Sequence, residues 1–281
     1  MVALWLMRPP QSDPYVSCSV SVRVGTLEEY LRKVNTDPKQ VRISIYHVVA
    51  AAIARVYRDF PAARSSVVAG RIWRHDHVGV LMPVSLLESE TTRTGEVGMM
   101  FLERAEQLSL RALAEQTRQS VASEKSGVSS HPFVRALLPI VERVPAALVH
   151  RMLDALAFAV GLPLVGPALH RRLPVTVFVT NPGSHFRAPE GMLVQGGAFS
   201  PPTGLVAVGS LLGMSAIQDM AIVEKDRIIA RAMLPLVYAW DHRLFDGVMA
   251  SQVLLRLSEI LQDPESEFGP TAEAQGAPIT P

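Results

Sequence analysis

The segment from residue 231 to residue 261 constrains the fold of this chain more than any other. It opens with an apolar run, residues 232–240, whose β-branched and aromatic side chains are typical of a strand buried on both faces. His242 follows this run after one residue, Asp241. Farther on, apolar residues recur at steps of three and four, as on one side of an amphipathic helix: Val253, Leu254, Leu257, Ile260 and Leu261. His242 therefore lies where a strand hands over to a helix, and regular elements can hold its side chain in position.

The spacing within this turn is compatible with proton-transfer chemistry. Asp246 follows His242 by four residues and Gly247 comes next, so an imidazole, a carboxylate and a residue free to adopt positive φ share one tight bend. Imidazole takes up a proton near neutral pH, and such transfer accelerates reactions by roughly 10²- to 10⁴-fold. A histidine beside a strand end can equally be a surface residue or a satisfied core residue. Spacing alone leaves both interpretations open.

The residues around His242 give the turn a more specific character. The segment reads Asp-His-Arg-Leu-Phe-Asp-Gly from Asp241 to Gly247. It resembles the His-x-x-x-Asp-Gly active-site signature of the dihydrolipoamide acyltransferases of 2-oxo acid dehydrogenase complexes. Their wider superfamily includes chloramphenicol acetyltransferase and the condensation domains of peptide synthetases, which usually have a second histidine where this chain has Asp241. The resemblance therefore favours the dihydrolipoamide acyltransferase branch.

Other stretches resemble the same family in order and character. Residues 175–180, followed by Asn181-Pro182-Gly183, are similar to its strand ending in Ser-Asn-x-Gly. Residues 200–202, Ser-Pro-Pro, are similar to its Pro-Pro segment, which leads into another strand, here residues 205–212. Residues 222–240 are similar to the hairpin before the catalytic turn. The resemblance covers the C-terminal third closely and the first 125 residues loosely.

This resemblance implies a fold, an assembly and an activity. The fold is α/β, a two-layer sandwich of a mixed sheet and helices like that of chloramphenicol acetyltransferase. The assembly is a homotrimer whose thiol channel lies between subunits. The activity is transfer of an acyl group between coenzyme A and dihydrolipoamide, with an acyl-coenzyme A thioester as substrate, no covalently bound cofactor, and a lipoyl group supplied by a separate lipoyl-domain protein.

The resemblance also assigns roles to individual residues. His242 is the expected general base, which accepts the proton of the attacking thiol. The hydroxyl of Thr180, in place of the commoner serine, is the expected donor to the oxyanion. Asp246 is expected to fix the turn by pairing with an arginine. Asn181 and Gly183 are expected at the substrate site, with Gly183 serving backbone geometry.

Two further histidines precede a Gly-Val step at residues 79–80. His75 and His77 stand two apart in a segment that predicts a strand, so both would lie on one face of it. A metal site would need a third ligand of matching geometry, and none is signalled, so we expect no metal. Family members often carry a histidine at this place. His77 is therefore expected on the wall of the substrate channel, although an ordinary strand histidine is the alternative.

The first 130 residues predict alternating strands and helices. A strand with strict period-two alternation is the clearest of them. Helix starts are marked by hydroxyl side chains at cap positions. The expected elements are a strand at 16–24, a helix from Thr26 to Val34 opened by a Thr26/Glu29 capping box, a helix at 45–59 capped by Ser44, a strand at 73–84, a helix after the cap Ser109, and a loop at 123–130.

Two segments differ from the family pattern. Residues 131–172 form a longer apolar connection whose uncharged part, 155–169, is interrupted by Pro163 and Pro167 and falls short of the roughly 20 residues that span a bilayer. We expect a helical hairpin that covers the sheet, packs on a neighbouring subunit or lies on a membrane surface, in that order. Residues 264–281, rich in Pro, Glu, Gly and Thr, predict a flexible tail after a catalytic domain at residues 1–263.

Composition excludes some classes of partner. The chain has 27 Lys and Arg against 26 Asp and Glu, spread along its length, so nothing indicates a nucleic acid. Cys18 is the single cysteine and predicts no internal disulfide, which suits the cytoplasm. No lysine stands in the Asp-Lys-Ala setting of a lipoyl domain, so we expect a free-standing catalytic domain. Two alternatives stay open: a scaffold or binding protein of this fold without activity, and an acyltransferase that uses a hydroxyl or amine acceptor.

Overall fold

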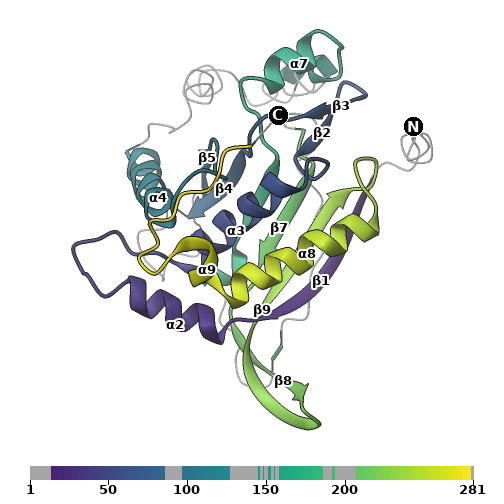
Figure 1. Cartoon of the computed structure of the whole chain (residues 1–281). Helices are drawn as coiled ribbons and strands as arrows, with labels where there is room; N and C mark the ends of the chain where they lie inside the picture. The colour runs from purple at the N-terminus through teal and green to yellow at the C-terminus, as the bar shows by residue number, and fades with distance from the viewer. Residues whose placement is uncertain are drawn as a thin grey trace.

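The chain folds into two layers, a mixed sheet and a set of helices that covers one of its faces (Figure 1). The strand order is β1-β9-β7-β6-β4-β5, and β8 pairs with β9. The computed structural model describes residues 14–85, 97–126, 145, 148, 151–152, 155, 158–185, 192–193 and 207–279. The strands of this sheet are β1 (Tyr15–Arg23), β4 (Val80–Ser85), β5 (Val97–Leu102), β6 (Val177–Thr180), β7 (Ser210–Met214), β8 (Gln218–Glu224) and β9 (Arg227–Asp241).

The helix layer contains α2 (Gly25–Val34), α3 (Ile45–Asp59), α4 (Leu110–Lys125) and α8 (Gly247–Gln262). The central helix is α3, which is apolar nearly all round because the sheet, α4 and α8 surround it. Ser44 caps it as predicted, and the His47 side chain accepts a hydrogen bond from the Ser44 backbone N–H at 3.0 Å. Burial lowers the pKa of His47 to about 4, so this imidazole stays neutral.

The two halves of the long strand β9 lie in different environments. Its first half pairs with β8 in a ribbon that extends beyond the body of the molecule (Figure 1), and its second half, from Met233, is buried in the sheet. The two turn residues of the ribbon, Lys225 and Asp226, both have positive φ, as a tight two-residue hairpin requires. Glu224 pairs with Arg231 at 3.0 Å and with Arg23 of β1 at 3.1 Å. These ion pairs connect the turn end of β8 to β9 and to β1.

The elements predicted between residues 16 and 59 are confirmed, except for one helix cap. Strand β1 follows the predicted alternation and pairs antiparallel with β9 from Tyr15 to Arg23. Helix α2 begins one residue earlier than predicted, and its N-cap residue is Val24, so the Thr26/Glu29 capping box is wrong. The Thr26 hydroxyl instead donates to the backbone carbonyl of Gln262 at 2.5 Å, which ties α2 to the end of α8. The Thr26 hydroxyl therefore bonds to a distant part of the chain and does not cap its own helix.

The single strand predicted at 73–84 is wrong, because two strands share that range. Strand β3 (Arg71–Arg74) pairs with β2 (Ser65–Val68) in a separate hairpin, and β4 begins at Val80. Between them the backbone N–H of Val78 donates to the buried carboxylate of Glu106 at 2.9 Å. A Cβ on Gly79 would lie 2.1 Å from the carbonyl oxygen of Pro174. These contacts end the strand pattern, and His75 and His77 therefore share no strand face.

Helix α4 begins after the predicted cap, since Ser109 Oγ accepts from the backbone N–H of Ala112 at 3.1 Å. The helix continues to Lys125, so the predicted start of the following loop, at residue 123, is too early. Most of the segment 131–172 lies outside the described residues. Its described end contains the helix α7 (Val165–His170), which packs on β2 at one end of the molecule (Figure 1).

The flexible tail predicted at 264–281 is wrong for residues 264–279. They form the helix α9 (Pro264–Phe268) and an extended segment packed on the helix layer, with Phe268 and Ala272 fully buried. Buried Arg55 of α3 donates to the carbonyl oxygen of Ala274 at 3.0 Å, and Gly276 donates to that of Gln107 at 3.3 Å. Backbone hydrogen bonds and a few apolar anchors order a segment whose composition alone predicts disorder.

Candidate active site

His242 lies directly after β9 and is held through its backbone. Its N–H donates to the carbonyl oxygen of Pro14 at 3.0 Å, just ahead of β1. Its imidazole is half-buried, and the ring centroid lies 6.5 Å from that of Trp240. Among the described residues no side chain hydrogen-bonds this imidazole. Both ring nitrogens are therefore available to a substrate.

An ion pair within the turn holds the backbone around His242. Asp241 is buried, and Arg243 donates to both of its carboxylate oxygens, with Nη2–Oδ2 and Nε–Oδ1 distances of 2.6 and 2.9 Å. The Arg243 backbone N–H also donates to Asp241 Oδ1 at 2.9 Å. This pairing raises the pKa of the Arg243 guanidinium above its ordinary value. Two charged neighbours in sequence thus clamp the turn on either side of His242.

Asp246 does not have the partner predicted for it. It is exposed, and its carboxylate accepts from the backbone N–H of Met249 at 3.0 Å, as the N-cap of α8. Among the described residues no arginine pairs with Asp246, and Arg243, the nearest in sequence, is engaged by Asp241. Asp246 thus determines where α8 begins, and it fixes the turn through that helix.

The residues behind His242 include a buried donor with no partner. Trp240 is only 4% exposed, and its Nε1 has no hydrogen-bond partner among the described residues. Its ring stacks on Tyr238 at 5.6 Å and on Phe245 at 6.2 Å. The Tyr238 hydroxyl lies 2.7 Å from that of Tyr57, which in turn contacts Ser210 Oγ. A rigid wall of aromatic rings therefore backs the turn.

Thr180 ends β6, and helix α3 holds that strand end in place. The Tyr46 hydroxyl donates to the carbonyl oxygens of Val179 and Pro83, at 2.7 and 3.2 Å. Thr180 itself is half-buried, as is Asn181 after it. A Cβ on Gly183 would lie 2.1 Å from the backbone nitrogen of Ala216, so only glycine fits there. The backbone role expected of Gly183 agrees with this close approach.

The His242 turn and the Thr180 strand end lie at opposite ends of the sheet. Thr180 is level with Gly213, which is level with Val237 of β9. His242 follows Val237 by five residues, so the two sites are about 16 Å apart along the strands and about 10 Å apart across them. In a single chain the two side chains cannot act on the same atom.

His77 lies near the His242 end of the sheet but has a different partner. Its Nδ1 donates to Glu106 Oε1 at 3.2 Å, and the Glu106 side chain is fully buried. Glu106 also accepts from the Gln107 side chain at 3.1 Å. Neighbouring His75 is buried in a separate cluster, 3.1 Å from Ser66 Oγ and 3.2 Å from His170 Nε2. Among the described residues no set of three or more His, Cys, Asp or Glu is arranged to bind a metal.

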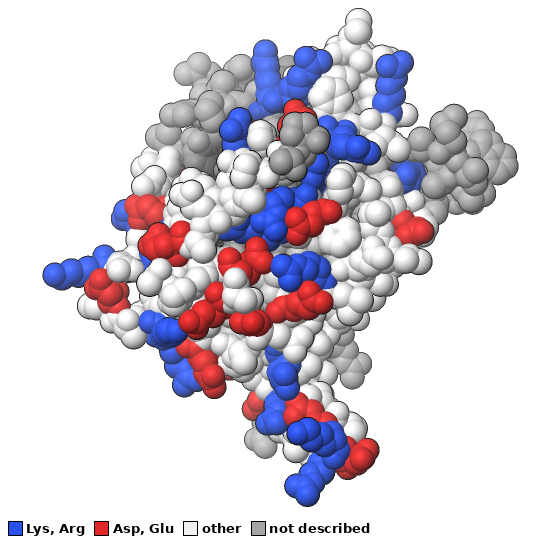
Figure 2. All heavy atoms as spheres, viewed as in Figure 1, with Lys and Arg blue, Asp and Glu red and all other residues white. Residues whose placement is uncertain are grey.

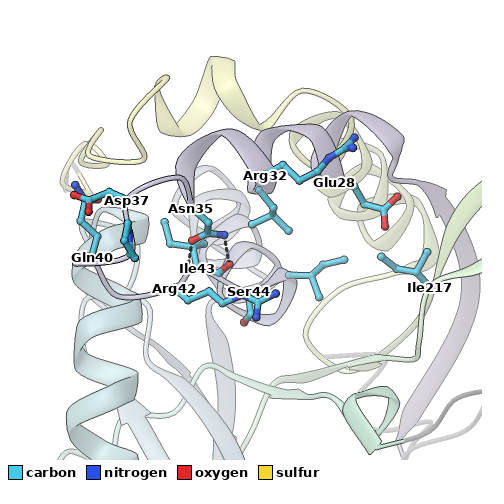
Figure 3. Close-up of a pocket in the computed structure, with 12 residues that line it drawn as sticks. Glu28, Arg32, Asn35, Asp37, Gln40, Arg42, Ile43, Ser44 and Ile217 are labelled. Atoms are coloured by element: carbon cyan, nitrogen blue, oxygen red, sulfur yellow. Dashed lines mark hydrogen bonds between the residues drawn. The ribbon is translucent and has the colours of Figure 1, made fainter.

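A groove of about 1180 Å³ opens at the Thr180 end, between α2, the loop that follows it and the N-terminus of α3 (Figure 3). Its floor includes Asn35 and Ile43, which exchange two hydrogen bonds of 2.8 Å. Ile217, which follows the strand end packed on Gly183, completes the wall. The charged lining residues are Glu28, Arg32, Asp37 and Arg42. No sequence motif marks this groove, since its residues come from separate elements.

Comparison with known proteins identifies the segment around the turn. The model of the family described as 2-oxoacid dehydrogenases acyltransferase (catalytic domain) matches residues 198–268. Residues 198–268 are thus similar to this family. His242 and Asp246 lie inside the matched segment, whereas Thr180, Asn181, Gly183 and His77 lie outside it. The sequence match thus covers the His242 turn, whereas the likeness at the other site residues is one of fold alone.

Individual proteins are similar to this chain over a short stretch. The chain is 39% identical over 72 residues to the dihydrolipoyllysine-residue succinyltransferase component of the 2-oxoglutarate dehydrogenase complex of Bartonella vinsonii subsp. berkhoffii, which is 26% of this chain and 18% of that relative. The chain therefore matches only about a fifth of the length of this relative.

Solved structures extend the likeness of fold to nearly the whole chain. A probable dihydrolipoamide acetyltransferase from Listeria monocytogenes superposes with a TM-score of 0.60 at 15% identity, over 93% of this chain and 88% of that one. A chloramphenicol acetyltransferase superposes with a TM-score of 0.51 at 12% identity, over 89% of each chain. These superpositions confirm the predicted fold class.

Proposed function

We propose that this protein transfers an acyl group between the thiol of coenzyme A and a dithiol acceptor such as dihydrolipoamide, with His242 as general base. The observation that carries the proposal is the His242 turn, clamped by Asp241 and Arg243 within the segment that matches the family. No side chain in the described part of the chain hydrogen-bonds the imidazole, and the aromatic rings around Trp240 pack behind the turn. The turn thus presents a positioned base at the edge of the fold.

The chemistry follows from the properties of a thiol. With a pKa near about 8.5, a thiol is mostly protonated at neutral pH and needs a base. Neutral His242 accepts the thiol proton while the sulfur attacks the thioester carbonyl carbon, which forms a new C–S bond and an oxyanion. When the oxyanion collapses, the original C–S bond breaks, and the departing thiolate takes the proton back from the imidazolium. Protons and sulfur groups balance over the cycle.

The oxyanion needs a donor, and we assign that role to the hydroxyl of Thr180 from a second subunit. Within one chain Thr180 and His242 lie at opposite ends of the sheet, so a complete site requires two chains. A homotrimer provides three such pairs with closed symmetry. The rotamer of Thr180 must point its hydroxyl toward the carbonyl, because its methyl group would otherwise occupy that place.

We assign the acyl carrier to the groove beside Thr180. Its apolar lining, which includes Leu31 and Ile217, suits an extended arm, and Arg32 and Arg42 suit the phosphates of coenzyme A (Figure 3). The acceptor dithiol would be presented by a separate lipoyl-domain protein in the cytoplasm. Asn181 and Gly183 then border the path from the groove to the reacting carbonyl.

The test is acyl exchange by the purified protein. Short, branched and medium-chain acyl-coenzyme A donors are screened against dihydrolipoamide, and release of coenzyme A thiol is followed. We expect turnover with at least one donor, and Arg42→Glu should raise KM for the donor while kcat changes little. Absence of turnover with every donor, in protein that is folded and oligomeric, would overturn the proposal.

A further inference from the structure

Helix α7 and the β2–β3 hairpin form one packed unit at the end of the molecule nearest His242 (Figure 1). A Cβ on Gly166 would lie 2.2 Å from the carbonyl oxygen of Val160 and 3.4 Å from Ala69 Cβ, so glycine permits this packing. The Trp73 ring meets that of His170 edge-on at 6.2 Å, and the Arg171 guanidinium lies 5.5 Å over the same indole. These contacts hold α7 against the hairpin.

We call its outer side the α7–β3 surface and define it by nine side chains. They are Arg71, Ile72, Arg74, Phe158, Leu162, Leu164, Val165, Arg171 and Arg172.

The apolar members of the α7–β3 surface are not covered by the described part of the chain. Leu164 is 87% exposed, Phe158 is 74% exposed and Ile72 is 51% exposed. Large apolar side chains at this exposure, on elements that pack together, are candidates for an interaction site. The expectation that residues 131–172 cover the sheet is not met by Phe158 and Leu164, whose side chains are exposed.

The charge of the α7–β3 surface is strongly one-sided. Its four arginines are all exposed, while Asp76 is the one exposed carboxylate in residues 69–77, and residues 158–173 contain no Asp or Glu. Figure 2 shows several groups of Lys and Arg at this end of the molecule and few acidic groups. Chain-wide charge is nearly balanced, so this concentration of arginine is local.

These observations discriminate between the possible occupants. A two-fold contact of this face with itself in a second copy would bring arginines against arginines, which is unfavourable. A bilayer with anionic headgroups satisfies both features, since guanidinium groups pair with phosphates while apolar side chains enter the headgroup and acyl boundary. None of the helices in the described part of the chain has the length and apolar character of a membrane-spanning segment.

We propose that the α7–β3 surface binds the surface of membranes that contain anionic phospholipids. The sequence expectation placed a membrane surface last among three possibilities, and the exposure and charge of these side chains move it to first. The proposal stands independently of the acyl-transfer activity, because none of its residues belongs to the site at His242 or Thr180.

The experiment is co-sedimentation of the full chain with vesicles. Phosphatidylcholine vesicles are compared with vesicles that also contain phosphatidylglycerol, at low and physiological salt. We expect the protein to pellet with the anionic vesicles, less so as salt rises, and to stay in the supernatant with phosphatidylcholine alone. Equal failure to pellet with both kinds of vesicle would overturn the proposal.

Variants separate a specific surface from general charge. Arg74→Glu/Arg172→Glu should lower partitioning at least about 25-fold, from roughly fivefold for each arginine. Phe158→Ser/Leu164→Ser should lower it at least about tenfold at unchanged charge. The matched control, Lys39→Glu/Lys125→Glu, changes net charge equally at two exposed lysines elsewhere and should stay within about twofold of wild type.

Two results would contradict the proposal even if the wild type binds vesicles. One is an equal loss in the lysine control, which would mean that only net charge matters. The other is that the Phe158→Ser/Leu164→Ser variant binds normally but becomes monomeric, which would make this face a contact between copies. Thermal unfolding of each variant establishes that it remains folded.

Discussion

His242 and His77 lie beyond the same end of the sheet, since Val80 at the start of β4 and Trp240 near the end of β9 are level across it. Each is half-buried, but they are held differently. His77 donates to the buried carboxylate of Glu106, whereas among the described residues no carboxylate meets the imidazole of His242. The carboxylate nearest to His242 in sequence, Asp241, is taken by Arg243.

Under the proposed function, pairing with a carboxylate does not by itself mark the catalytic histidine. The Glu106 pair connects the loop before β4 to the segment before α4, and it satisfies a buried charge. At His242 the charges hold the backbone and leave the ring free for a substrate. The histidine with the better side-chain partner is therefore assigned to structure, and the one with the open ring to chemistry.

Substitution of the two histidines gives the largest expected contrast. His242→Ala should lower kcat for acyl exchange by about 10² to 10⁴, because it removes the general base. His77→Gln should leave kcat within a few-fold, because its partner Glu106 is structural. Steady-state acyl transfer, with a thermal melt of each variant, measures both. A larger loss in the His77 variant at equal stability would reverse the assignment.

The next contrast tests whether His242 works with Thr180 of another chain. Thr180→Val should lower kcat by about 10² to 10³, since it removes one oxyanion donor and keeps the volume. When His242→Ala and Thr180→Val subunits exchange in equal amounts, about a quarter of the interfaces contain both intact residues, so about a quarter of wild-type activity should return. Light scattering checks the trimer, and differently tagged subunits check exchange. Proven exchange without recovery would exclude a shared site.

The sequence predicted the regular elements better than the contacts that hold the two histidines. Local periodicity indicates β1, α3 and α8 because each is built from residues close in the chain. The Asp241–Arg243 clamp is not predicted, because the family signature marks Asp246 as the carboxylate of the turn. The break between β3 and β4 depends on Glu106, about 30 residues away, and the packed segment 264–279 depends on Arg55 of α3. Such long-range polar partners leave no periodic signal.

Removing the two buried carboxylates should separate stability from activity. Asp241→Asn and Glu106→Gln should each lower the free energy of unfolding by about 2 to 3 kcal/mol, because each weakens hydrogen bonds to a buried charge. Only Asp241→Asn should also lower kcat, since only Asp241 holds the backbone of His242. Denaturant titration and acyl transfer measure the two effects. Equal loss of kcat in both variants would contradict the conclusion that Asp241 supports catalysis while Glu106 supports only stability.

A third histidine environment makes stability sensitive to acid. Burial lowers the pKa of His75 to about 3 and that of His170 to about 4, from 6.5 for an exposed side chain. Below about pH 6.5 the unfolded chain binds protons that the folded chain excludes, so this stability is complete above that pH and is lost as the pH falls. Between pH 7 and pH 5 the loss should be about 1 to 2 kcal/mol per histidine.

Denaturant unfolding at the two pH values measures this loss. In the double variant His75→Leu/His170→Leu, the free energy of unfolding should decrease less between pH 7 and pH 5 than in the wild type, because both titrating groups are absent. Ser66→Ala, which changes a neighbour of His75 without removing a titrating group, should retain it. An unfolding free energy that stays constant from pH 7 to pH 5 in the wild type would contradict the buried, neutral state of these imidazoles.

The smallest expected effect concerns Asp246, the residue that the sequence pattern places beside His242 and the structure places at the start of α8. Asp246→Ala should lower the free energy of unfolding by about 1 kcal/mol, because the backbone N–H of Met249 loses its cap. Asp246→Ser keeps a capping oxygen and should restore most of that stability. Since the carboxylate touches neither the imidazole nor Arg243, kcat should follow stability, with the serine variant close to wild type. If the serine variant were stable but slow, the carboxylate charge itself would act on the reaction, and the His242 turn would depend on a charged partner as the His77 segment does.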